Sequence, residues 1–331
     1  MNRYSFAKKA FLLTTILFTL QYLLVWFVLP AMPIAHSQPD IRLDKLFLQP
    51  LDILYLGDST LVETHPRDTN RQSIPAMLND HYPNLSIAMF SQGAYQMDMY
   101  NALVKYICAR NYTTDLIIIP INMRTFSPAW DLRPEWQFER DKRELEYGQY
   151  LLLKPFSHLL ISLGPPLDTI SKKTFSEATI EFRGSPVGKV SYFESLLCQQ
   201  PNNERSKQIF IYHYLYGLSK DHRKVQSLIN LVELANNNNV KMLFYFTPID
   251  RQSGYTYVGP EFDQILDDNI QTLVTMIYGE NVNYIDLSDT LVSADFSWKR
   301  YPNEHLKESG RLKVAAALAD AINTWLAASF P

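Results

Sequence analysis

Residues 51–60 read LDILYLGDST: an apolar run ends at Gly57, and Asp58, Ser59 and Thr60 follow at once. Continuous apolar runs of this length, bounded by turn residues, are typical of strands that are covered on both faces. Four later runs have the same character. The five predicted strands are Leu51–Leu56, Leu85–Phe90, Asp115–Ile121, Lys241–Phe246 and Val282–Leu287.

Amphipathic segments separate these runs. Four helices are predicted, over Tyr95–Arg110, around Val225–Val232, and over Pro260–Tyr278 and Leu306–Leu326. Alternation of strands and helices predicts an α/β fold, a three-layer parallel sheet of the flavodoxin-like kind with helices on both faces. Residues 129–222 interrupt the alternation with Pro-, aromatic- and charge-rich stretches, so we expect an insertion at the rim of the sheet rather than a second complete domain.

The N-terminus carries three cations, Arg3, Lys8 and Lys9, followed by residues 10–34 without a single charge. About 20 apolar residues cross a bilayer as a helix, and flanking cations favour the cytoplasmic side. We therefore expect a cytoplasmic segment over 1–9, a transmembrane anchor over 10–34, a linker over 35–44 and a domain over 45–331. The protein would be single-pass in the cytoplasmic (inner) membrane, with that domain facing the periplasm or exterior. A cleaved signal peptide is the alternative, and the length of the apolar segment argues against it.

Composition excludes few classes of function. The formal net charge of −3 gives no basic field for a polyanion, so no nucleic-acid partner is expected. The histidines have no metal-ligand spacing and no nucleotide-binding glycine motif follows a strand, so neither a metal nor a cofactor is expected. Cys108 and Cys198 are the only cysteines, and their spacing does not decide whether they pair.

Polar residues follow the predicted strands at the edge where open α/β sheets bind ligands. Serine chemistry needs a nucleophilic hydroxyl, a base and donors for the oxyanion. Ser59 is the candidate nucleophile and His305 the candidate general base, which would also return the proton as general acid. The backbone N–H groups of Ser59 and Gly93 and the amide of Asn122 are the candidate oxyanion hole.

Four short motifs carry a resemblance to a known family. LYLGDST, SQG, PIN and EHLKESG resemble, in order, the serine, glycine, asparagine and histidine blocks of the SGNH (GDSL-like) hydrolase superfamily. The resemblance covers most of residues 51–326 except the insertion. It implies that Ser59, Gly93, Asn122 and His305 form an esterase site, with His305 at the opening of the final helix.

One position departs from the family pattern. The resemblance implies an aspartate three residues before the histidine, and Pro302 stands there. Asn303, Glu304, the more distant Asp295 or a backbone carbonyl are the candidates for orienting the imidazole. A serine–histidine dyad is the remaining option, and loss of a fixed tautomer would slow the chemistry.

Several of these residues have structural alternatives. Ser59 could cap the helix that follows the first strand. Arg124 could contact a substrate anion or form a structural ion pair. Trp130, Arg133 and Trp136 could stack on sugars or pack the insertion's own core. His65, six residues after Ser59, is a possible decoy base.

The segment INMRTFSPAWDLRP, residues 121–134, together with the expected anchor resembles extracytoplasmic SGNH proteins linked to O-acylation of surface polysaccharides. This implies an esterase or O-acyltransferase acting on acyl, above all acetyl, esters of glycans, beside a membrane-bound O-acyltransferase as partner. A catalytically silent accessory subunit of such a complex is one alternative, and a lipid or thioester hydrolase at the membrane surface is another.

Overall fold

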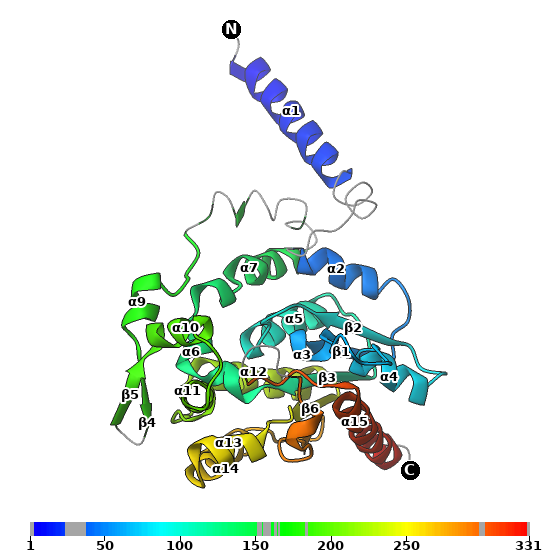
Figure 1. Cartoon of the computed structure of the whole chain (residues 1–331). Coiled ribbons are helices and arrows are strands. Elements are labelled where there is room, and N and C mark those ends of the chain that lie inside the picture. Colours follow the sequence, from blue (N-terminus) through cyan, green and yellow to red (C-terminus); the bar gives the residue numbers. More distant parts are fainter. Residues whose placement is uncertain are drawn as a thin grey trace.

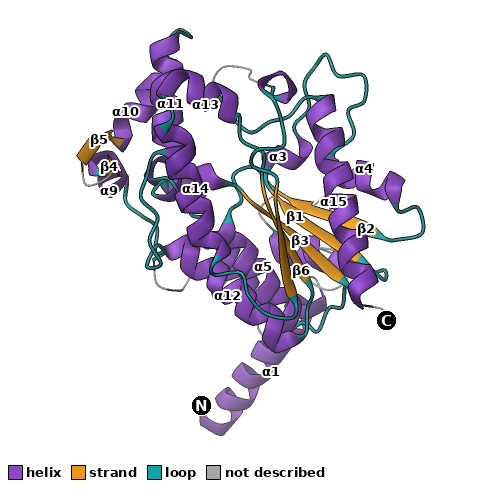
Figure 2. Cartoon of the chain, turned by 90° about the horizontal axis from the view of Figure 1, so that it is seen from below, coloured by secondary structure: helices purple, strands orange, loops and turns teal. Residues whose placement is uncertain are grey.

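The structure is a computed structural model that describes residues 3–23, 38–150, 154, 160–161, 164, 166–182, 185–297 and 302–329. Its centre is a five-stranded parallel sheet in the order β2-β1-β3-β6-β7 (Figure 2). The five predicted strands are confirmed, with boundaries shifted by at most two residues. The strands are β1 (Ile53–Gly57), β2 (Ile87–Ser91), β3 (Leu116–Ile121), β6 (Met242–Phe246) and β7 (Val282–Asp286).

Helices cover both faces of this sheet, as the alternation of the sequence predicts. Figure 2 shows α5, α12 and α14 on one side of the strands and α4 and α15 on the other. The longest helices of the domain were predicted, whereas the short helix α4 was not. These helices are α4 (Ile74–His81), α5 (Met97–Ala109), α12 (Arg223–Asn238), α14 (Glu261–Val274) and α15 (Glu308–Ser329).

The central strands are apolar throughout because each of their faces is buried. In β1, Leu54 and Leu56 pack with α5 and α12, whereas Ile53 and Tyr55 pack with α4 and α15. Successive side chains of a strand point to opposite faces, so both sets are needed to fill two helical layers. The order of the strands reverses direction at β1, which makes the β1–β3 edge a topological switch point where ligands bind.

The segment 129–222 holds several short elements, most of which Figure 1 shows beside the sheet. Part of it forms a separate apolar cluster around Phe193 and Tyr212, while Phe210 and Tyr214 join the main core. These elements are α6 (Pro128–Asp131), η4 (Pro134–Trp136), α7 (Glu139–Gly148), α9 (Lys172–Glu177), β4 (Thr179–Phe182), β5 (Ser185–Lys189), α10 (Val190–Cys198) and α11 (Asn203–Tyr214).

Short elements complete the described chain. They are α2 (Pro39–Leu46), α3 (Ser59–Val62), η3 (Met123–Phe126), α13 (Arg251–Val258) and η6 (Ser293–Asp295). Four of them follow the carboxyl ends of strands, whereas α2 occupies part of the segment 35–44 that was expected to be a linker.

The N-terminal segment contains one described helix, α1 (Arg3–Leu23), which Figure 1 shows apart from the sheet. Its large apolar side chains are exposed: 76% of Phe11 and 60% of Leu12 are open to solvent. Within the described residues, no helix combines the length and the apolarity that crossing a membrane requires. Residues 24–34 of the expected anchor lie outside the described residues.

Candidate active site

Ser59 and His305 meet at the carboxyl edge of the sheet. Ser59 Oγ lies 3.2 Å from His305 Nε2, although the two residues are 246 positions apart in the chain. That distance is within reach of a hydrogen bond between a nucleophile and its base. The side chain of His305 is only 14% exposed. The two residues that the sequence predicts as nucleophile and base therefore lie side by side in the structure.

The turn that carries Ser59 is built by its neighbours. Asp58, not Ser59, is the N-cap of α3: its carboxylate accepts hydrogen bonds from the Thr60 N–H (2.8 Å) and the Thr60 hydroxyl (2.7 Å). Gly57 permits a close approach, since a Cβ there would lie 2.0 Å from Leu61 Cδ1. Ser59 is thus the first residue of the helix, and its hydroxyl is free of the capping role that was its structural alternative.

His305 lies on an extended segment rather than at the opening of the last helix, which begins only at Glu308. Phe296 and Leu306 form an antiparallel bridge, and the His305 carbonyl accepts from the Ser297 N–H at 2.7 Å. The helix begins two residues after the expected start at residue 306, because this bridge uses the backbone that the first helical turn would need. The bridge fixes the backbone of the candidate base.

A carboxylate that the sequence analysis missed faces the other ring nitrogen of His305. Glu63 Oε2 lies 3.3 Å from His305 Nδ1, which makes an ion pair when the imidazole is protonated, and the Glu63 side chain is 40% exposed. Glu63 is the C-cap of α3, and its N–H donates to the Ser59 carbonyl at 2.9 Å. The sequence feature that could have identified Glu63 is its place four residues after Ser59, because residues four apart lie on the same side of a helical turn.

The side chains that the sequence offers for orienting the ring of His305, Asn303, Asp295 and Glu304, make other contacts. Asn303 Oδ1 accepts from the His305 backbone N–H at 3.0 Å, so it holds the chain and not the ring. Asp295 binds the Ser309 hydroxyl (2.6 Å) and Lys313 Nζ (2.7 Å). The decoy base His65 accepts from the Arg67 N–H through Nδ1 at 3.2 Å, within its own loop.

Glu304 is buried in an ion pair with Arg124. Arg124 Nε lies 3.2 Å from Glu304 Oε2, and the two side chains are 2% and 1% exposed. The Tyr214 hydroxyl donates to Glu304 Oε1 at 2.6 Å. Burial raises the pKa of Glu304, although the charge of Arg124 and the hydrogen bond from Tyr214 act to lower it. Arg124 therefore forms a structural ion pair. Through Arg124 and Tyr214, Glu304 connects the histidine segment to η3 and α11.

The three candidate oxyanion donors lie at the ends of adjacent strands. Within the described residues, the N–H groups of Ser59 and Gly93 donate to no protein acceptor. A Cβ built on Gly93 meets nothing within 4 Å, so that backbone borders open space. Asn122 Nδ2 donates to Asp58 Oδ2 at 3.3 Å, which fixes the amide beside Ser59. Asp58 thus orients an oxyanion candidate as well as capping α3.

The aromatic residues of the insertion pack on one another and on arginines. The rings of Trp130 and Trp136 are 4.1 Å apart. Arg124 lies 4.3 Å above the ring of Trp130, and Arg133 lies 4.3 Å above that of Trp136. Trp130 is 8% exposed. This group belongs to the packing of the insertion and not to an open sugar-binding face.

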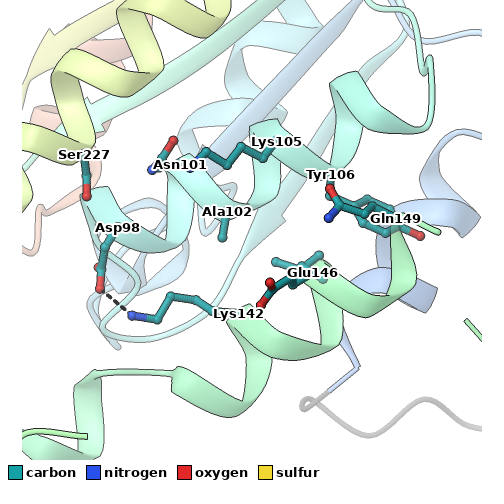
Figure 3. Close-up of a pocket in the computed structure, with 10 residues that line it drawn as sticks. Asp98, Asn101, Ala102, Lys105, Tyr106, Lys142, Glu146, Gln149 and Ser227 are labelled. Carbon is teal, nitrogen blue, oxygen red and sulfur yellow. Dashed lines mark hydrogen bonds and ion pairs between the residues drawn. The ribbon is translucent and has the colours of Figure 1, made fainter. Parts of the chain in front are cut away.

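A cavity of about 370 Å³ lies between α5, α7 and α12 (Figure 3). Its wall includes the ion pair between Lys142 Nζ and Asp98 Oδ2 at 3.0 Å, together with Asn101 and Glu146. None of the candidate catalytic residues lines it.

Cys108, half-buried on α5, and the exposed Cys198 are both free thiols. In the described part of the chain, no group of His, Cys, Asp or Glu side chains has the arrangement of a metal site.

The fold is similar to those of solved hydrolases at low sequence identity. A mutant of the acetyl-xylooligosaccharide esterase Axe2 from Geobacillus stearothermophilus gives a TM-score of 0.40 at 11% identity, over 81% of this chain and 92% of that chain. Unmutated Axe2, an acetylxylan esterase, gives 0.38 over the same shares at 11% identity. An inferred acylhydrolase from Bacteroides fragilis gives 0.37 at 9% identity, over 88% of this chain and 99% of that chain.

No protein-family model matches the sequence, and no curated protein matches it.

Proposed function

We propose that this protein is a serine esterase or O-acyltransferase that works through an acyl-enzyme on Ser59. The observation that carries the proposal is the 3.2 Å contact between Ser59 Oγ and His305 Nε2. In the first half-reaction the hydroxyl attacks the acyl carbonyl, its proton passes to Nε2, and the imidazolium then protonates the departing alcohol. In the second half-reaction water or an acceptor hydroxyl takes the acyl group by the same route in reverse.

The substrate we propose is an O-acyl, chiefly O-acetyl, ester on a cell-surface glycan. Support comes from the resemblance of residues 121–134 and of the N-terminal layout to proteins of polysaccharide O-acylation. By its name, Axe2 acts on acetylated xylan. A membrane-bound O-acyltransferase is the proposed partner. A lipid hydrolase would cleave long acyl chains, so hydrolysis of nitrophenyl acetate but not of nitrophenyl palmitate is expected.

We propose that the N-terminal segment anchors the protein in the cytoplasmic membrane, with the sheet domain outside the cytoplasm. Support comes from the cations Arg3, Lys8 and Lys9 before an uncharged stretch and from the exposed apolar side chains of α1. The full chain should remain in the membrane fraction after alkaline extraction, with its N-terminus intact by mass spectrometry. A mature N-terminus near His36 would overturn the anchor in favour of a cleaved signal.

The serine chemistry is tested with the full chain in detergent and p-nitrophenyl acetate. The wild type and Ser59→Ala are compared with Ser195→Ala, a control at an exposed serine of α10. Removal of the nucleophile should lower kcat by at least about 10³-fold, and the control should not change it. A fluorophosphonate should label Ser59 and no other serine. Equal turnover by the wild type and Ser59→Ala contradicts the proposal, and absence of turnover and labelling in the wild type favours a silent accessory subunit.

A further inference from the structure

We infer that Glu63 is the carboxylate that orients His305, so that one helical turn supplies both the nucleophile and the acid. The inference rests on the proposed serine chemistry and names its third member. The structure brings Glu63 Oε2 to 3.3 Å from His305 Nδ1. The position where the family resemblance implies this acid is Pro302, which has no carboxylate to offer.

The local geometry of α3 explains why Glu63 can take this place. Residues four apart lie on the same side of a helical turn. Ser59 and Glu63 are such a pair, and the backbone hydrogen bond from the Glu63 N–H to the Ser59 carbonyl closes the turn at 2.9 Å. One imidazole can therefore face both side chains, with Nε2 toward the serine and Nδ1 toward the glutamate.

Hydrogen bonds of Arg311 connect the loop after Glu63 to the segment after His305. Arg311 is fully buried on α15, and its Nη1 binds both Asp68 Oδ2 (2.7 Å) and the Leu306 carbonyl (3.0 Å). Partial burial acts to raise the pKa of Asp68, but the hydrogen bond from Arg311 and further donors lower it overall. Arg311 is thus a positioning residue that fixes the distance between the two sides of the site.

A second contact between the same two segments comes from Glu308. Its Oε2 accepts the backbone N–H groups of Thr69 and Asn70, each at 2.9 Å. These bonds and those of Arg311 join residues 68–70 to the start of α15. These bonds hold the backbone of the loop that follows Glu63, and the charge-assisted ones among them stabilise more than neutral hydrogen bonds.

Two other acids near His305 in sequence, Glu304 and Asp295, form ion pairs and hydrogen bonds with other side chains. Glu304 faces Arg124 and Tyr214, and Asp295 faces Ser309 and Lys313. Among the residues that the structure describes, Glu63 is the carboxylate that pairs with His305 Nδ1. In this arrangement the carboxylate of Glu63 favours the tautomer that carries its proton on Nδ1, so that only Nε2 exchanges a proton with Ser59, the leaving alcohol or water.

The test compares Glu63→Gln and Glu63→Asp with Glu280→Gln, a control at an exposed glutamate before β7. Glu63→Gln should lower kcat for p-nitrophenyl acetate by about 10- to 100-fold. This is less than the roughly 10⁴-fold loss for a buried orienting acid, since water can reach the exposed side chain. Glu63→Asp should retain part of the rate, and Glu280→Gln all of it.

A purely structural role for Glu63 would lower the melting temperature or raise KM, whereas an orienting role lowers kcat alone. We therefore expect KM and the melting temperature of Glu63→Gln to match the wild type. A kcat within about twofold of the wild type overturns the inference while Ser59→Ala is inactive. If the wild type itself does not turn over and Ser59 is not labelled, it is the proposed function that fails.

Discussion

Two segments meet at His305, and they are held in opposite ways. The nucleophile turn, residues 58–63, ends in Glu63, which is 40% exposed and pairs with the imidazole. The histidine segment, residues 303–306, contains Glu304, which is 1% exposed and pairs with Arg124. The buried glutamate is adjacent to the histidine in sequence, yet it serves to anchor the segment. Nearness in sequence is therefore a poor guide to which carboxylate lies against the imidazole.

The largest effect on stability is expected for Glu304→Gln. The change leaves the charge of Arg124 buried without its carboxylate, which costs about 3–5 kcal/mol when one partner of a buried pair is removed. Urea unfolding of the full chain measures it. Replacing both residues, as Arg124→Met with Glu304→Gln, should recover part of the loss, whereas equal destabilisation by the single and double variants contradicts a buried-pair role.

Asp58→Ala should have the next largest effect, because Asp58 both caps α3 and holds Asn122. Loss of an N-cap costs about 0.5–2 kcal/mol. Ser73→Ala removes the N-cap of α4 and is the matched control. Asp58→Ala should lose more stability than Ser73→Ala, since it also removes the hydrogen bonds to the Thr60 hydroxyl and Asn122, and only Asp58→Ala should lower kcat. If the two have the same kcat, Asp58 does not position the site.

Glu63→Gln should change stability by less than about 1 kcal/mol, the range for exposed ion pairs. Glu63 and Glu304 differ most clearly here. The change at Glu63 should have the smaller effect on the free energy of unfolding and the larger effect on kcat. Urea unfolding and kinetics on the same preparation decide it. A loss of 3 kcal/mol or more would show that Glu63 anchors the fold as Glu304 does.

Glu144 is a buried glutamate that pairs with the exposed Arg140. Burial raises its pKa to about 7, against the hydrogen bond from Arg140 and with added repulsion from Asp40. Between the ordinary glutamate pKa and 7 the folded state holds a proton that the unfolded state has released, so stability falls as pH rises through this range. Glu144→Gln should flatten the difference in unfolding free energy between pH 5 and pH 8. An unchanged slope would mean that Glu144 is ionised throughout.

Gly93→Ala should have the smallest effect on folding. A Cβ there meets no protein atom within 4 Å, and the same is true of Gly217, the control. Both variants should unfold within about 1 kcal/mol of the wild type. If the Gly93 N–H faces the oxyanion, a methyl group beside it crowds the acyl group, and only Gly93→Ala should lower kcat/KM. Equal activity of both would remove Gly93 from the site.

Local pattern was enough to predict the sheet and the reactive pair. The strands around Leu56, Ile118 and Phe244 are short apolar runs, and residues buried on both faces have to be apolar whatever packs on them. Ser59 and His305 each follow from a motif read in its place along the chain. The start of the last helix was misplaced because the bridge between Phe296 and Leu306 depends on a partner strand that local periodicity does not reveal.

The sequence by itself determined the α/β layering, the order of the strands along the chain, and the identity of Ser59 and His305 as partners. Only the tertiary structure decided that Glu63 faces the imidazole and that Glu304 and Arg124 are buried against each other. The physical reason is that a carboxylate takes its role from burial and from the charges brought next to it. Those charges come from elements far apart in the chain, and only the packed sheet brings them together.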